Sequence, residues 1–335
     1  MHTMHTFYFF FYNPLYSKGF RGVEGMHQVM HTARIPMHTT GFFSGTGDFF
    51  SNIGKKRPVP GPILRKPGFT TGGRISPFMD DFESALEPYG DTRVLAAWVG
   101  GSHAHGLAGP GSDIDLRIVI APDPADILLD RADTTIGLHD PDISIMTPVA
   151  FLKGLTKGSP NMLEALALPA GCLLLDSGLL DGLKPLAAGL ATRRTVDMAL
   201  GNAASNLHLL ERDMDARRRR KLQAESMRLL LAAGLACADP AAPWPCRLPD
   251  DDLTELRRIR EHGMDGEELA RQLPAMREYA AAHRRPASNT KAVREAERMV
   301  ANPLKGIILG TTASFPMDGV LSAVRMFAGD AYPMA

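Results

Sequence analysis

The alternation of hydrophobic and polar residues divides the chain into an irregular first part and a regular remainder. Up to residue 78 the sequence follows neither the period of a helix nor that of a strand. Such a segment has little apolar surface to bury. We therefore expect residues 1–78 to be a disordered, proline- and glycine-rich extension, and the folded protein to begin near Met79.

The regular part contains two apolar runs separated by small residues. Val94–Val99 is a continuous apolar run, which predicts a buried strand, and "DIDLRIVIA", which begins at Asp113, predicts a second strand. Between them, Gly100 and Gly101 predict a turn. Ser102 is expected to cap one helical turn, which Gly106 ends. The predicted order is strand, glycine turn, helical turn, loop and strand.

Farther along the chain the period changes to that of helices. Residues 195–284 carry apolar positions at spacings of four and three, which predicts helices that pack against one another. Ser159-Pro160 is typical of a helix start. The run Arg217–Arg220 interrupts the stripe. We expect a solvated turn there, although such a run also has the charge to attract RNA or a phosphorylated partner.

Together these elements predict an α+β fold. A small mixed β-sheet with helices on one side is expected over residues 79–170, and an α-helical domain over residues 171–290. Residues 291–335 contain short apolar pieces without a recognisable motif, so we describe them as a C-terminal tail of unknown role.

Composition narrows the possible partners. Of the 335 residues, 44% are hydrophobic, enough for a substantial core. Residues 1–78 hold nine Lys/Arg against two Asp/Glu, whereas the remainder holds 28 against 35. A mildly acidic body argues against a broad nucleic-acid surface. No apolar run approaches the roughly 20 residues that span a bilayer, so no membrane partner is expected.

The cysteines indicate the compartment. Cys172, Cys237 and Cys246 show neither zinc-site spacing nor a disulfide framework. This usage is typical of a reduced, cytoplasmic protein.

The candidate chemistry lies between the two predicted strands. Asp113 and Asp115 are two residues apart, so on a strand they would project to the same face. Paired carboxylates suit a divalent cation, and Mg²⁺ prefers one or two carboxylates together with phosphate oxygens. The turn at Gly101 and Ser102 offers backbone N–H groups and a hydroxyl to those phosphates. These features predict a site for a nucleoside triphosphate with its metal ions.

The segment "GGSHAHGLAGPGSDIDL" resembles the signature of the DNA polymerase β-like nucleotidyltransferase superfamily, in which Gly-Ser is followed after about ten residues by Asp-x-Asp. More narrowly, it resembles an uncharacterised family of predicted bacterial and phage nucleotidyltransferases, over roughly residues 92–285. The matching motif positions are Gly101, Ser102, Ala104, Gly106, Ser112, Asp113, Asp115 and Arg117. Glu225 departs from the family, which often has His there, between Lys221 and Arg228.

The resemblance implies a third carboxylate on a later strand. Asp142 in "HDPDISIM" is favoured over Asp140, because Pro141 makes the residue before it more typical of a turn. By resemblance, Asp113, Asp115 and Asp142 bind two Mg²⁺ ions, with Mn²⁺ as an alternative metal, and Asp142 serves the acceptor and takes its proton.

The remaining site residues have less specific roles. Gly101, Ser102 and Ser112 are expected to hold the nucleotide, while Arg117 either pairs with the aspartates or reaches a phosphate. Glu164 is expected to have a structural role rather than to serve an acceptor. The His103/His105 pair is a weak candidate for a metal, because the two side chains point apart on one helical turn. Lys221, Glu225 and Arg228 share a helical face that, in the resemblance, looks toward the triphosphate.

The implied function is transfer of a nucleoside monophosphate from an NTP, with ATP the first choice, to an unknown hydroxyl acceptor with release of pyrophosphate. One alternative is a glycosyltransferase that holds a nucleotide-sugar through Asp-x-Asp, which leaves the Gly-Ser turn and the third aspartate without a role. Another is a catalytically silent, antitoxin-like nucleotide-binding protein, which would be expected to have lost a catalytic aspartate. The sequence specifies neither the acceptor nor the oligomeric state.

Overall fold

The structure is a computed structural model that describes residues 77–109 and 112–331. The extension expected over residues 1–78 lies outside the described residues apart from its last two positions. These open helix α3 (Pro77–Leu86), which continues into a short 3-10 turn at Glu87–Tyr89. The first regular element therefore begins close to the predicted start at Met79.

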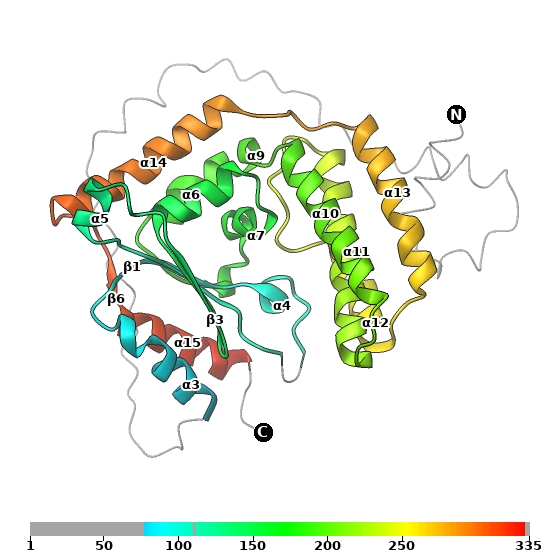
Figure 1. Cartoon of the computed structure of the whole chain (residues 1–335), viewed down its shortest axis with the longest axis horizontal. Coiled ribbons are helices and arrows are strands. Elements are labelled where there is room, and N and C mark those ends of the chain that lie inside the picture. The colour runs from blue at the N-terminus through cyan, green and yellow to red at the C-terminus, as the bar shows by residue number, and fades with distance from the viewer. Residues whose placement is uncertain (1–76, 110–111, 332–335) are drawn as a thin grey trace, which may run out of the picture. The chain divides into compact units, whose positions relative to one another are not determined.

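A small mixed β-sheet forms from the predicted strands, as expected for this α+β fold (Figure 1). The strand order is β3-β4-β2-β1-β5. Strand β1 runs antiparallel to β2 and β5, whereas β2 and β4 are parallel. The strand bounds are β1 Arg93–Val99, β2 Leu116–Ile120, β3 Thr135–His139, β4 Asp142–Met146, β5 Leu173–Asp176 and β6 Phe315–Pro316, the last of which pairs with β1.

Helices cover both faces of this sheet, so the expectation of helices on one side was wrong. Helices α6 (Pro148–Thr156) and α8 (Leu179–Leu183) pack on the face that carries Trp98. Helices α3 and α15 (Met317–Ala331) pack on the opposite face. The continuous apolar sequence of β1 explains why helices cover both faces, because a strand without a polar face must be buried on both sides.

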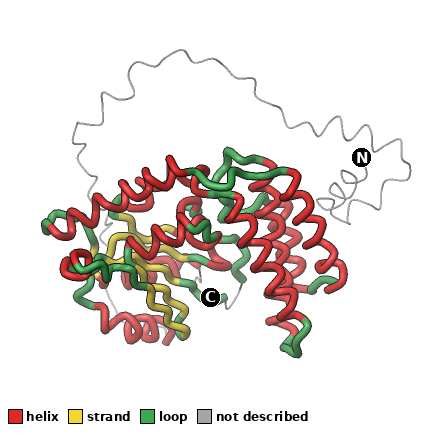
Figure 2. The backbone as a smooth tube through the Cα atoms, turned by 45° about the horizontal axis from the view of Figure 1, so that its top comes forward, coloured by secondary structure: helices red, strands yellow, loops and turns green. Residues whose placement is uncertain are grey.

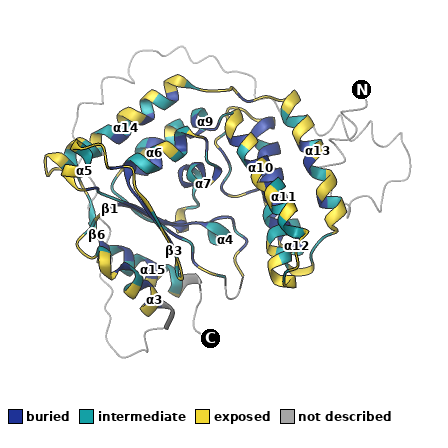
Figure 3. Cartoon of the chain, in the orientation of Figure 1, coloured by how far each residue is buried: buried dark blue, intermediate teal, exposed yellow. Residues whose placement is uncertain are grey.

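The helical part follows the sheet and is built around one buried helix. Helix α11 packs against α10, α12 and α13, in the group of helices that lies beside the strands (Figure 2). The middle of α11 is almost entirely buried (Figure 3). The bounds of these and the remaining helices are α4 Gly101–Ala104, α5 Pro124–Leu128, α7 Pro160–Glu164, α9 Ala187–Leu190, α10 Arg193–Leu210, α11 Ala216–Ala238, α12 Asp250–His262, α13 Gly266–Ala282 and α14 Thr290–Ile308. None of the helices in the described residues is both long and apolar enough to cross a membrane.

The arginine run belongs to a helix and not to the predicted turn. Arg217–Arg220 lie in the first turns of α11. The preceding residue Asp215 caps this helix, because its carboxylate accepts the backbone N–H of Arg218 at 2.8 Å. The break in the apolar stripe therefore comes from the polar first turns of α11, and the turn itself lies earlier, between α10 and Asp215.

Candidate functional site

The site is built on the turn that follows β1. Gly101 has a φ of +56°, in the left-handed region that favours glycine. A Cβ at this position would lie 3.1 Å from the Oδ2 atom of Asp115, so a side chain would also crowd the carboxylate. Helix α4 begins at Gly101 with Gly100 as its N-cap, so the capping residue is two positions earlier than the predicted Ser102. Gly106 ends the turn with a φ of +72°, as expected.

The two aspartates of the motif precede β2 instead of lying on it, which corrects the predicted strand. β1 ends at Val99, opposite Leu116, and beyond this pair β2 has no antiparallel partner. The backbone N–H of Gly100 still donates to the carbonyl of Asp115 at 2.8 Å, which keeps this residue beside the glycine turn. The Asp115 side chain is consequently 19% exposed, whereas that of Asp113 is 81% exposed.

Each of these aspartates lies near a cationic side chain. The Nη2 atom of Arg117 donates to Oδ2 of Asp115 at 2.8 Å. Burial alone would lower the pKa of Arg117, but Asp115 raises it above its ordinary value. The Nζ atom of Lys221 lies 3.9 Å from Oδ2 of Asp113. Of the two roles predicted for Arg117, pairing with the aspartates or reaching a phosphate, the structure shows an ion pair with Asp115.

Asp142 reaches the same place through the sheet register. β2 and β4 are parallel, with Leu116 paired to Ile143, so Asp115 and Asp142 precede adjacent positions at the same end of the sheet. Burial and the negative charge of Asp115 both raise the pKa of the Asp142 carboxyl. Asp142 lines the cleft described next, whereas Asp140 is not in the wall of that cleft.

A cleft of about 580 Å³ joins the sheet end to the helical part. Its volume suits a small-molecule ligand such as a nucleotide. The residues predicted from the sequence that line it are Gly101, Ser102, Asp113, Asp115, Arg117, Asp142, Glu164, Lys221, Glu225 and Arg228. Ser112 lines an adjoining hollow instead, together with Ser102 and Asp113.

Three polar lining residues were not identified from the sequence as site residues. Asn161 lies on α7 and Arg260 on α12, and neither belongs to a motif. Arg218 was noted only as part of the arginine run. Tertiary packing brings Asn161 from α7, and Arg218 and Arg260 from the helical part, to the cleft, so no local sequence signal marks them.

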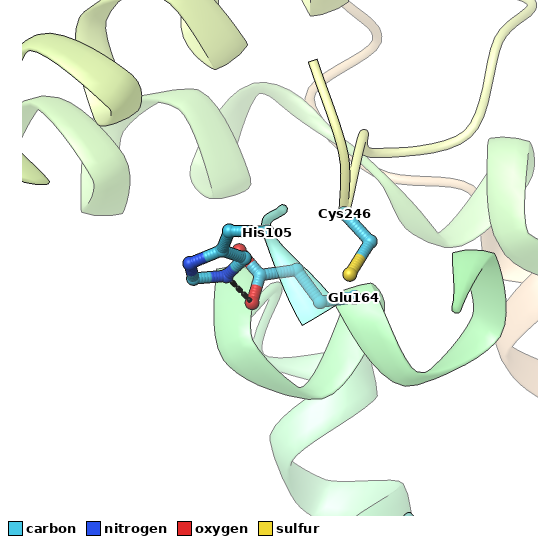
Figure 4. Close-up of side chains that lie close together, drawn as sticks. All are labelled: His105, Glu164 and Cys246. Atoms are coloured by element: carbon cyan, nitrogen blue, oxygen red, sulfur yellow. Dashed lines mark hydrogen bonds and ion pairs between the residues drawn. The ribbon is translucent and has the colours of Figure 1, made fainter. Parts of the chain in front are cut away.

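A buried network of charged groups forms the inner wall of the cleft. The Nη1 atom of Arg228 donates to Oε1 of Glu164 at 2.9 Å, and its Nε and Nη2 atoms donate to Glu225. The second Glu164 oxygen lies 3.0 Å from Nε2 of His105 (Figure 4). Burial alone would raise the pKa of Glu164, but Arg228 and His105 hold it at about 2. The network links α4, α7 and α11.

His105 and Glu164 also lie near Cys246, with ligand atoms within 4.8 Å of one another (Figure 4). A metal does not suit this group. Both Glu164 oxygens are already hydrogen-bonded, and the buried guanidinium of Arg228 adjoins them. Burial raises the pKa of the Cys246 thiol. This thiol donates a hydrogen bond to the backbone carbonyl of Ala104, with 3.8 Å between sulfur and oxygen. His103 packs its ring against Phe327 and takes no part.

The three aspartates fit Mg²⁺ better by their chemistry. They provide hard oxygen ligands at the rim of one cleft, beside a glycine turn whose backbone can approach a phosphate. Within the described ranges, His105, Glu164 and Cys246 are the only group of three His, Cys, Asp or Glu residues whose ligand atoms all lie within 4.8 Å of one another. Asp113, Asp115 and Asp142 therefore line the same cleft, but their carboxylate oxygens do not all lie within 4.8 Å of one another.

Comparison with known proteins agrees with this geometry. A family model described as a nucleotidyltransferase domain matches residues 82–151, which include the glycine turn and all three aspartates. No curated protein matches the sequence of this chain. Domains of this kind generally use divalent metal ions. Residues 82–151 are thus a nucleotidyltransferase domain of the DNA polymerase β-like superfamily, and the protein is a transferase of phosphorus-containing groups.

Proposed function

We propose that this protein transfers a nucleoside monophosphate from an NTP, with ATP the first candidate, to a hydroxyl acceptor and releases pyrophosphate in a Mg²⁺-dependent reaction. The observation that carries the proposal is the meeting of Gly101, Ser102, Asp113, Asp115 and Asp142 at one cleft. Neither alternative function needs all of them. A glycosyltransferase leaves the glycine turn and Asp142 without a role, and a silent binding protein has no need of three carboxylates.

The proposed roles follow from the positions of the residues. Gly101 and Ser102 bind phosphate oxygens through backbone N–H groups and the hydroxyl, since no side chain obstructs the turn. Asp113, Asp115 and Asp142 hold the metal ions, which supply charge stabilisation for the attacking and leaving oxygens. Asp142 is the first residue of β4 and accepts the proton of the acceptor hydroxyl. Arg117 orients Asp115 through their 2.8 Å contact.

The helical part completes the proposed nucleotide site. Lys221 on α11 lies beside Asp113 and is suited to neutralise a phosphate. Arg228 lines the same cleft, but its three donor contacts to Glu164 and Glu225 hold it in place as a fixed positive charge. Catalysis in this account is mostly the positioning of substrate and the stabilisation of charge.

The proposed location is the cytoplasm. Cys172, Cys237 and Cys246 are all buried free thiols. Such cysteines suit a reducing compartment.

Turnover of labelled nucleotides tests the proposal. The full-length protein is incubated with Mg²⁺, each labelled NTP in turn and a cell extract, and pyrophosphate release and the labelled product are measured. Asp115→Asn should reduce pyrophosphate release by about 10³-fold, because the metal-dependent stabilisation contributes several kcal/mol. Asp81→Asn, an exposed change on α3, is the matched control.

The products distinguish the alternatives. Near-normal pyrophosphate release by Asp115→Asn rules out the mechanism. Release of a nucleoside diphosphate from a nucleotide-sugar would indicate a glycosyltransferase, and NTP binding without any turnover would indicate a silent binding protein.

A further inference from the structure

Helix α15, which belongs to the C-terminal segment without a recognisable motif, lies far outside the matched residues 82–151. Its residues Met317, Val320 and Val324 are buried on the face of the sheet that also carries α3. Arg325 forms an ion pair with Glu83 of α3, which adds a second connection. These contacts hold α15 against the nucleotidyltransferase domain.

One aromatic side chain of α15 extends from the sheet to the glycine turn. Phe327 follows Val324 by three residues and therefore lies on the same helical face. It packs both on the core of this sheet face and on a small buried cluster that includes Ala104. Its ring meets that of His103 edge to face, with the centroids 5.3 Å apart and the planes at 75°. Phe327 thus contacts two residues of helix α4.

The His103 ring connects this contact to the aspartate motif. It forms a hydrogen bond with the backbone of Ser112, the residue before Asp113. Burial lowers the pKa of His103 below its ordinary value, so the ring is neutral at pH 7. A neutral imidazole donates from only one nitrogen, so its hydrogen bond depends on the orientation of the ring. The edge-to-face contact with Phe327 restricts that orientation.

Neither aromatic side chain touches the place where a nucleotide would bind. Phe327 and His103 are both absent from the walls of the cleft and of the adjoining hollow. The Asp113 side chain is 81% exposed, and its nearest cation, Lys221, is 3.9 Å away. The backbone before Asp113 therefore has a large part in directing its carboxylate. An effect of Phe327 on a bound nucleotide would have to pass through α4 and this backbone.

We propose that Phe327 is a positioning residue for nucleotidyl transfer. Its ring holds His103 in the orientation that keeps the segment before Asp113 beside the glycine turn. This inference rests on the proposed function. The competing role is purely structural, in which the Phe327 ring only adds apolar burial and its loss lowers stability alone. In the positioning role its loss also weakens nucleotide binding and slows transfer, because small displacements of reacting groups are costly.

Two substitutions of Phe327 and one control separate these roles in the full chain. Phe327→Leu removes the ring but keeps an apolar side chain, and Phe327→Tyr retains the ring. Leu321→Ala is the matched control, because Leu321 is a partly buried residue of α15 that packs on the sheet core and not on the cluster with Ala104. Thermal melting measures stability. Calorimetric titration with Mg²⁺ and a non-hydrolysable NTP analogue gives Kd, and pyrophosphate release gives kcat and KM.

The variants should differ in binding and turnover more than in stability. Phe327→Leu should raise the Kd for the analogue about three- to tenfold and lower kcat about tenfold, because Asp113 and the glycine turn are less well aligned. Leu321→Ala should lower the melting temperature, since it loses buried apolar surface, and should keep the wild-type Kd and kcat. Phe327→Tyr should restore both constants to within about twofold of the wild type, because it keeps the ring.

A double-mutant cycle tests the part played by His103. His103→Ala should itself weaken analogue binding and turnover. Adding Phe327→Leu to His103→Ala should then change Kd and kcat by less than about twofold, because residues that act through one contact are not additive. Additive losses would show that Phe327 acts independently of His103 and would overturn the inference.

The outcomes are separable from those for the proposed function. Wild-type Kd and kcat in a folded Phe327→Leu, equal losses in Leu321→Ala, or failure of Phe327→Tyr to restore them would each overturn the inference. Normal turnover by Asp115→Asn overturns the proposed function without affecting the comparison of Kd values. If the wild type binds the analogue without turnover, the Kd values alone decide on the inference. Absence of analogue binding by the wild type overturns both.

Discussion

Two buried arginines, one in the wall of the cleft and one at the far end of the helical part, show how the same side chain serves different tasks. Arg228 is 1% exposed and donates only to the carboxylates of Glu164 and Glu225. Arg285 is 3% exposed and donates to six backbone carbonyls. One arginine neutralises charge beside a ligand site, whereas the other joins chain segments.

The partners explain opposite pKa shifts. Burial alone would lower the pKa of Arg228, but Glu225 and Glu164 raise it above its ordinary value. Burial lowers the pKa of Arg285. The carbonyl dipoles and the nearby Cys237 and Asp239 offset this effect of burial less than the two carboxylates do at Arg228. Several of the carbonyls that Arg285 binds lie at or just beyond the ends of α9 and α11, where helix carbonyls lack partners within the helix. In this protein the buried arginine that binds carboxylates lies at the candidate ligand site, whereas the buried arginine that binds carbonyls holds chain segments together.

The largest expected effect comes from Arg228→Met. It would leave Glu164 and Glu225 without their cation, and removing one partner of a buried ion pair costs about 3–5 kcal/mol of unfolding free energy. Because Arg228 lines the cleft, the folded variant should also show a raised KM for the NTP. Denaturant unfolding and steady-state kinetics measure the two effects. An unchanged unfolding midpoint would contradict the description of the network.

Arg285→Met should destabilise the protein by about 3 kcal/mol, because several carbonyls lose a charged donor. Water can reach some of them, which limits the loss. The folded fraction should keep the wild-type KM and kcat, since Arg285 lies outside the cleft wall. A changed KM at full folding would remove the distinction between the two arginines.

The network should also make stability depend on acid. The pKa of Glu164 is about 2 in the folded protein, below its ordinary 4.5, so its contribution is present above pH 4.5. That contribution, up to about 3 kcal/mol, is lost as the pH falls from 4.5 towards 2. The difference in unfolding free energy between wild type and Glu164→Gln should therefore shrink over this window. A constant difference would show that Glu164 is not held as a carboxylate.

Much of the site is local in sequence, and that part was predicted. The apolar run before Gly100 predicted β1. The glycines after it predicted the turn, in which Gly101 adopts the positive φ that glycine tolerates. Asp142 was preferred to Asp140 as the third carboxylate, and it alternates along β4 with Ile143 and Ile145, which lie in the core while Asp142 is exposed. Short-range backbone preferences determine these features.

The parts that were not predicted depend on contacts between distant segments. Glu164 and Arg228 are 64 residues apart in sequence, and no spacing rule marks them as partners. β2 begins at Leu116 because β1 ends opposite it, so the start of one strand depends on the other. Arg217–Arg220 are helical because Asp215 caps α11 and because this helix packs against α10, α12 and α13. Tertiary context decided each of these cases.

The smallest expected effect distinguishes the two candidate third carboxylates. Asp140→Asn should change turnover less than about twofold and stability by less than about 0.5 kcal/mol, because the residue is exposed and lies outside the cleft wall. Asp142→Asn should abolish transfer while weakening NTP binding less. Pyrophosphate release and nucleotide titration measure both variants. Loss of activity in Asp140→Asn with retention in Asp142→Asn would transfer the proposed role to Asp140.

The central claim is that the glycine turn and three aspartates form one nucleotide and metal site. A crystal structure of the full chain with Mg²⁺ and a non-hydrolysable NTP analogue tests it most directly. The account predicts metal ions bound by Asp113, Asp115 and Asp142, with phosphate oxygens on the backbone of Gly101 and Ser102. Phosphates bound away from this turn, or metal bound by His105, Glu164 and Cys246 instead, would contradict it.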